Sequence, residues 1–180
     1  VKDTYIYILK LVELWNAYEA LRGYVTALLG YSLPKRAPNN EKPKHIEFRK
    51  GVENFFEKTK ALEEFQQLAI LLKKQAAQKG TFQQDFIVYT ERIEQAKNIE
   101  SDVKKQIKNI KDYVTNDHEL APVEILALIY SERNLYFHNG EPAKMGISYA
   151  SRKFLLKAYH DCLVQVILRT IVYVLQEQIN

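Results

Sequence analysis

The sequence predicts an all-α fold, an up-and-down bundle of about five to six helices that occupies residues 1–180 as one domain. Helix-breaking residues are few, with six Gly and five Pro among 180 residues, and long stretches contain neither. In these stretches apolar residues recur three or four positions apart, which is the spacing of one face of a helix. No strand pattern survives, because β-branched runs such as 167–174 lie inside long helical windows.

The composition is that of an ordinary globular domain with a real core, 47% hydrophobic and 27% charged. A net charge of +4 is compatible with an anionic partner, although solubility is the commoner reason for such a balance. The single cysteine, Cys162, excludes an internal disulfide and fits a reducing compartment. No uninterrupted apolar run reaches the length of a membrane span, and the N-terminus lacks the regions of a signal peptide. We therefore expect a cytoplasmic protein that does not involve a membrane.

The first half of the chain predicts two long helical segments separated by a loop. Residues 2–29 form one helix candidate, and residues 46–79 form another with a candidate break near Thr59. The intervening segment 30–44 contains three prolines and reads as a loop of unusual length. Its basic residues, with Lys35 and Arg36 foremost, either contact a phosphate backbone or simply belong to a solvated loop.

Two shorter helices are expected over residues 82–98 and 101–114, with Ser101 as the N-cap of the second. One side of the second helix is apolar, and the opposite side carries four lysines. A lysine-rich helix face is usually a solvated surface, and the alternative is an RNA-binding stripe. The lysines are Lys104, Lys105, Lys108 and Lys111.

The last part of the chain predicts two helices joined by a second loop. Pro122 is well placed as a first helical residue, and Gly140, Pro142 and Gly146 mark the loop. Ser148 is expected to cap the final helix, which continues to about Gln178. That helix has apolar residues on more than one side, which indicates packing against several helices or partly against a second subunit. We expect Cys162 to be a small buried hydrophobic residue rather than a reactive thiol.

Several familiar chemical motifs are missing from the sequence. There is no HExxH, no Cys/His cluster, no Walker A loop and no G-x-S-x-G, so neither a metal nor a cofactor is predicted. His160 and Asp161 are neighbours on a helix and point about 100° apart, which makes them a poor catalytic pair. We interpret His160 as structural.

The candidate catalytic residues are Arg133, Asn134 and His138, at the end of the helix that precedes Gly140. Asn134 and His138 are four residues apart and share one helix face. Arg133 supplies a permanent cation suited to phosphate, and His138 can move a proton near neutral pH. These are the groups needed to cleave RNA without a metal. Arg133 and His138 lie about 140° apart on an ideal helix, so one chain can use both only if the last turn is distorted.

At this point the sequence resembles a known family. The segment RNLYFHNG is similar to the R-(N/D/H)-x-x-x-H motif of HEPN domains, which are all-α proteins. The segment LVELWNAYEALRG resembles the LW-x-A-x-E-x-L stretch near the start of several HEPN subfamilies. Segments 30–44 and 45–100 match no subfamily pattern.

The resemblance implies a metal-independent endoribonuclease with a toxin, defence or RNA-processing role. Active HEPN domains usually form homodimers in which two Arg/His motifs face each other across a shared cleft. By position, Arg133 would bind the phosphate, His138 would act as general base or acid, and Asn134 would be the polar residue that follows the arginine. Glu19 would be the first-helix acidic residue found near the site in some members.

The same resemblance leaves a non-catalytic alternative open. Some HEPN domains are dimerisation or partner-binding modules, so an antitoxin or a nucleotidyltransferase-type protein is a possible partner besides RNA. The motif also has a purely structural reading, in which Arg133 pairs with Glu132, Glu141 or Glu19 and His138 favours the C-terminal end of the helix dipole. Tyrosines near the motif either stack on bases or pack in the core. These are Tyr130, Tyr136 and Tyr149.

Overall fold

The computed structural model describes residues 2–28, 55–139 and 146–179, and within these ranges it contains helices and turns but no strand. This confirms the predicted all-α bundle. The elements, in chain order, are α1 (Lys2–Leu28), α3 (Leu62–Ala76), α4 (Phe82–Gln95), α5 (Ser101–Asn116), the short 3-10 helix η1 (Pro122–Ile125), α6 (Leu126–Asn139) and α7 (Tyr149–Ile179).

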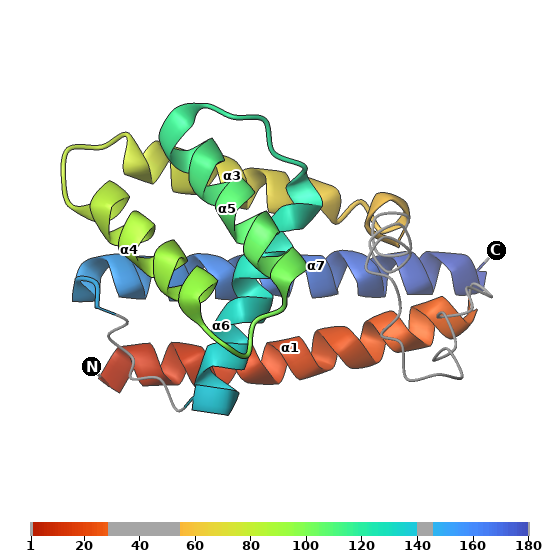
Figure 1. Ribbon diagram of the computed structural model, residues 1–180. Helices are drawn as coiled ribbons and strands as arrows, with labels where there is room; N and C mark the ends of the chain where they lie inside the picture. Colours follow the sequence, from red (N-terminus) through yellow and green to blue (C-terminus); the bar gives the residue numbers. More distant parts are fainter. Residues whose placement is uncertain (1, 29–54, 140–145, 180) are drawn as a thin grey trace.

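The two longest helices, α1 and α7, lie side by side and run in the same direction (Figure 1). In the N-terminal halves of the two helices the rings of Tyr7 and His160 are 6.0 Å apart. Near their C-terminal ends Gln178 Nε2 donates to the hydroxyl of Tyr24 at 3.4 Å. The first and last helices of the chain therefore form the base on which the remaining helices pack.

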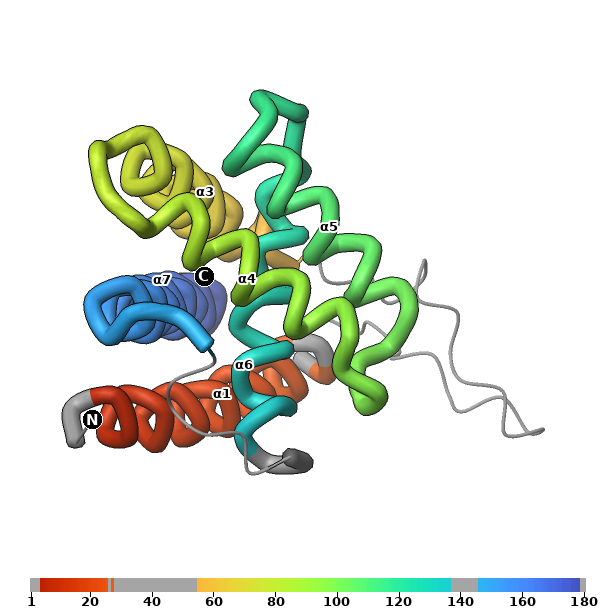
Figure 2. Tube along the Cα trace, turned by 60° about the vertical axis from the view of Figure 1, so that its left-hand side comes forward, coloured from red at the N-terminus to blue at the C-terminus, as the bar shows by residue number. Residues whose placement is uncertain are grey.

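The other helices cover this base in a layer that encloses the core. Figure 2 shows α3 beside α7, while α6 passes beneath α4 and α5 to reach α1. A single cluster of buried side chains connects the elements, and its largest fully buried members are aromatic. They include Tyr89, Tyr159, Phe56, Phe65 and Phe86. Burial of these rings is the main driving force for the bundle.

Most predicted boundaries are confirmed where the structure describes them. The break near Thr59 is real, because Lys60 adopts a left-handed φ of 56° immediately before α3. Pro122 opens η1, and Ser148 caps α7 by accepting from the Ser151 amide at 3.3 Å. Ser101 is not an N-cap: Glu100 holds that position, and Ser101 is the first helical residue.

Helix α7 is long and apolar enough, by length and composition alone, to cross a membrane, with a mean hydropathy of 1.3 over its best window. The core helix of a bundle passes the same test, and 39% of that window is buried against the rest of the molecule. Its outer face nevertheless exposes aliphatic side chains. These are Leu168, Ile171, Val172 and Leu175.

Candidate functional site

The motif-bearing helix α6 is inserted between other elements, so most of its side chains are buried. Ser131, Glu132, Asn134 and Leu135 are 4% exposed or less. Arg133 is half-buried, in contrast to its neighbours on either side. A helix buried on so much of its circumference cannot rotate freely, so the placement of Arg133 is determined by what holds the residues around it.

Glu132 is held by a buried polar network that the sequence did not reveal. Arg152 of α7 donates to both of its carboxylate oxygens, with Nη1 2.7 Å from Oε2, and the two side chains are 3% and 2% exposed. The hydroxyl of Tyr89 of α4 donates to Oε2 at 2.9 Å. The Arg152 guanidinium also lies 5.8 Å from the centre of the Tyr89 ring. Three helices thus meet at one carboxylate.

The titration of these groups follows from their burial. Burial alone would lower the pKa of Arg152, but the Glu132 carboxylate outweighs it, so the net pKa lies above the usual arginine value. Burial raises the pKa of Tyr89, and the nearby Tyr159 and Glu132 add to the effect. Arg152 therefore stays charged and Tyr89 stays a neutral hydrogen-bond donor through the physiological pH range.

Arg133 and Asn134 contact each other directly. Arg133 Nη1 donates to the amide oxygen of Asn134 at 2.9 Å, which fixes one edge of the guanidinium. The carbonyl of Asn134 accepts a long hydrogen bond of 3.5 Å from Asn98 Nδ2, in the turn between α4 and α5. The sequence predicted that Asn134 shares a helix face with His138, and the structure gives it a further contact, with the arginine.

His138 belongs to α6 by its backbone, while its side chain lies outside the described part of the structure. The helix remains α-helical through Asn139, so the backbone does not show the distorted last turn that a single-chain site requires. On a regular helix five residues span about 7.5 Å and about 140°. Position 138 is in register with Asn134 and diverges from Arg133.

Tyr130 is half-buried, whereas Glu19 is exposed. The Tyr130 ring packs against the ring of Trp15 of α1, with centroids 5.7 Å apart, so it contributes to the α1–α6 contact. Glu19 follows Trp15 by one turn and is exposed. Helix periodicity puts its carboxylate on the side of α1 that carries Trp15. Tyr136 is half-buried and Tyr149 is exposed.

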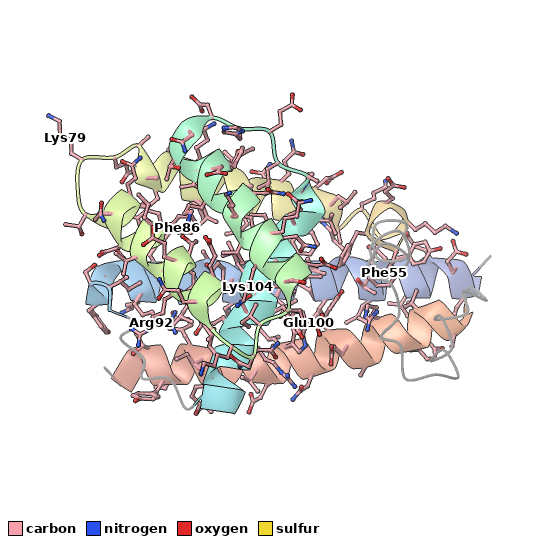
Figure 3. The ribbon with its side chains drawn as sticks, viewed as in Figure 1. Phe55, Lys79, Phe86, Arg92, Glu100 and Lys104 are labelled. Carbon is pink, nitrogen blue, oxygen red and sulfur yellow. The ribbon has the colours of Figure 1, made fainter. Side chains whose placement is uncertain are left out.

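The predicted basic residues divide into four groups. Lys104 is half-buried on α5, in the region that crosses α6 in Figure 3, whereas Lys105 and Lys108 are exposed. Lys111 forms an ion pair with Glu94 at 2.8 Å, so this member of the stripe is engaged within the bundle. Lys35 and Arg36 lie in a segment outside the described residues.

His160 and Cys162 are the two other titratable residues of α7 for which the sequence predicted a structural role. His160 Nδ1 lies 3.1 Å from Asp161 Oδ1, so the two side chains are in contact although they are neighbours on a helix. The long reach of the two side chains overcomes the 100° between their positions. Cys162 is buried, as predicted. No group of His, Cys, Asp or Glu among the described residues is arranged to hold a metal.

One feature of the sequence indicated that Arg152 is buried and needs a partner. Position 152 lies one turn before Leu155 and Leu156 and two turns before Tyr159, all of which are buried. An arginine in the apolar register of a helix must find a buried partner. The sequence could not identify that partner, because Glu132 is adjacent to Arg133 and was assigned to it as a possible pair.

Comparisons of the chain with protein-family models, with curated proteins and with solved structures found no match.

Proposed function

We propose that the protein is a metal-independent endoribonuclease of HEPN type, in which Arg133 and His138 act on an RNA phosphodiester at the cleft of a homodimer. The observation that carries the proposal is the Arg133 side chain, half-buried beside buried residues and fixed by Asn134 at 2.9 Å. A guanidinium held at one edge is prepared to stabilise charge that develops on a phosphate.

The reaction needs a base, a cation and no redox partner. His138 takes the proton of the ribose 2′-hydroxyl, and the 2′-oxygen forms a bond to phosphorus as the bond to the 5′-oxygen breaks. Arg133 stabilises the additional negative charge on the phosphoryl oxygens in the transition state. The leaving 5′-oxygen receives a proton from water, so the products are a 2′,3′-cyclic phosphate and a 5′-hydroxyl end.

The regular course of α6 favours a site shared between two chains. Because Arg133 and position 138 diverge on one helix, the arginine of one protomer and the histidine of its partner are the simpler combination. This arrangement also agrees with the shared cleft that the HEPN resemblance implies. The two protomers would contribute one cation and one base to each of two equivalent sites.

Cleavage of single-stranded RNA in EDTA tests the activity. We expect His138→Ala to lower the rate by about 10²- to 10⁴-fold, as expected for loss of a general acid–base group. His118→Ala is the matched control, because His118 is exposed in the segment before η1. Wild-type protein that leaves the RNA intact would contradict the proposal and favour a non-catalytic partner-binding module. A His138→Ala variant that cleaves like wild type would contradict the assignment of His138 as the base.

Complementation tests whether the site is shared. In a heterodimer of Arg133→Ala and His138→Ala chains, a shared arrangement leaves one site with both groups, whereas a single-chain arrangement leaves none. Co-expression with random association should therefore restore about a quarter of the wild-type activity. Complete absence of activity in the mixture, with heterodimers present, would show that each site uses one chain only.

A further inference from the structure

The buried pair of Glu132 and Arg152 directly adjoins the candidate site, and its position raises the question of what it does. Glu132 immediately precedes Arg133, and its carboxylate receives hydrogen bonds from α4 and α7. The pair is not used in the reaction described above, since both side chains are almost completely enclosed.

Stability alone is a weak explanation for such a pair. Removing two charges from water is costly, and their attraction in the interior only about compensates for that cost. Well-packed apolar side chains of similar volume commonly serve the fold as well or better. An ion pair in this place therefore calls for a contribution that apolar packing does not supply.

One such contribution is to fix the orientation of a helix. A bidentate guanidinium–carboxylate contact has one preferred plane and distance, unlike an apolar contact, which tolerates sliding. With Tyr89 as a third anchor, Glu132 is fixed relative to both α4 and α7. Successive helix residues are about 100° apart, so fixing Glu132 toward the core also fixes the direction of Arg133. If α6 were rotated about its axis by one residue, Arg133 would be buried in place of Glu132.

We propose that Glu132 and Arg152 are positioning residues that set the rotation of α6 and thereby present Arg133 to the substrate. The effect on catalysis rests on the proposed ribonuclease function, whereas the effect on the orientation of α6 does not. A second contact, from Asn98 to the carbonyl of Asn134, steadies the same helix two residues further on.

The molecule contains its own reporter for the orientation of α6. Trp15 is the only tryptophan, is 4% exposed and packs against Tyr130 of α6. A rotation of α6 changes the surroundings of this indole, and its fluorescence emission therefore reports on the helix even where no RNA is cleaved.

The main test replaces both charges at once, in Glu132→Met/Arg152→Met. We expect a folded protein of moderately lower thermal stability, because the buried Tyr89 hydroxyl loses its acceptor, with a shifted Trp15 emission maximum and a kcat about 10- to 100-fold lower at nearly unchanged KM. The matched control is Glu64→Gln/Arg169→Met, which removes a more exposed pair between α3 and α7 whose Nε–Oε1 distance is 2.5 Å. The control should leave the Trp15 emission and kcat at wild-type values.

A second variant guards against misfolding of the first. Arg152→Lys keeps the positive charge but loses the planar fork, so we expect a folded protein with a smaller change of the same kind. Native Trp15 emission together with native kcat in either folded variant would overturn the proposal. If wild-type protein cleaves no RNA, the ribonuclease function fails, and the Trp15 emission of the same variants still decides the positioning role.

Discussion

The rings of Trp15 and Tyr130 lie 5.7 Å apart at an interplanar angle of 51°, which joins the first helix to the helix that carries the motif. Such tilted aromatic pairs stabilise a core beyond the area that they bury. The contact gives Tyr130 a packing role, which is one of the two readings that the sequence leaves open, the other being a contact with RNA bases. Packing requires only the ring of Tyr130, whereas a role in the site could also require its phenol hydroxyl.

Substitutions at Tyr130 separate packing from chemistry. We expect Tyr130→Phe to retain the free energy of unfolding and the cleavage rate, because the ring remains. Tyr130→Ala should lower the free energy of unfolding by about 2 kcal/mol, measured by urea titration of Trp15 fluorescence, because it opens a cavity beside the indole. A Tyr130→Phe protein that is fully stable but slow on RNA would instead assign the hydroxyl to the site.

Asp85 of α4 is the acceptor that anchors the start of α7. Ser148 Oγ and Ser151 Oγ each donate to its Oδ2 at 2.6 Å. Burial opposes ionisation of Asp85, but these hydrogen bonds outweigh it, so its pKa lies below the usual value. The ionised carboxylate therefore contributes stability above the unfolded-state pKa of about 3.9, and this contribution is lost as the pH falls through the folded-state pKa.

The dependence of thermal stability on pH in the acid range tests the contact between Asp85 and the two serines. Asp85→Asn should be less stable than wild type near neutral pH, and the difference between the two proteins should shrink as the pH falls below about 4. Thermal melts at a series of pH values measure both. Ser148→Ala is the companion variant and should cost about 1 kcal/mol through loss of the helix cap. A constant difference across the acid range would mean that Asp85 is not the titrating group.

Cys162 should be unreactive in the folded protein. Burial raises the pKa of its thiol, and the nearby Glu64 carboxylate adds to the effect, so little thiolate exists at pH 8. We expect a disulfide reagent to label native protein on the order of 100-fold more slowly than protein in urea. Cys162→Ser, which should give no labelling in either state, is the control. Rapid labelling of native protein would show that α7 separates readily from α3.

Sequence reasoning predicted the helices well because apolar spacing reports directly on which face is buried. Cys162 is buried, as its place in the apolar pattern of the last helix predicted. Contacts between distant segments were not predictable, since spacing does not tell which helices become neighbours. Glu132 and Arg152 are 20 residues apart and meet only after α6 and α7 have packed. The resemblance identified Arg133 and His138, but not what holds them.

Lys60 adopts a left-handed backbone conformation that disfavours a side chain. Its φ is 56°, and the turn is closed by a hydrogen bond of 2.9 Å from the Ala61 amide to the Phe56 carbonyl. An L-residue with a Cβ is strained there, whereas glycine is not. Lys60→Gly should therefore raise the free energy of unfolding by about 0.5 to 1 kcal/mol, measured by urea titration.

Asp117 provides the matched comparison for Lys60, because it has a φ of 58° at the end of α5. Aspartate tolerates the left-handed region better than lysine, and this one also forms an ion pair with Lys73. Asp117→Gly relieves less strain and removes the pair, so it should give a smaller gain than Lys60→Gly, or none. An equal gain at both positions would indicate that backbone strain alone governs these turns, and a loss at Lys60 would show that its side chain stabilises the break before α3.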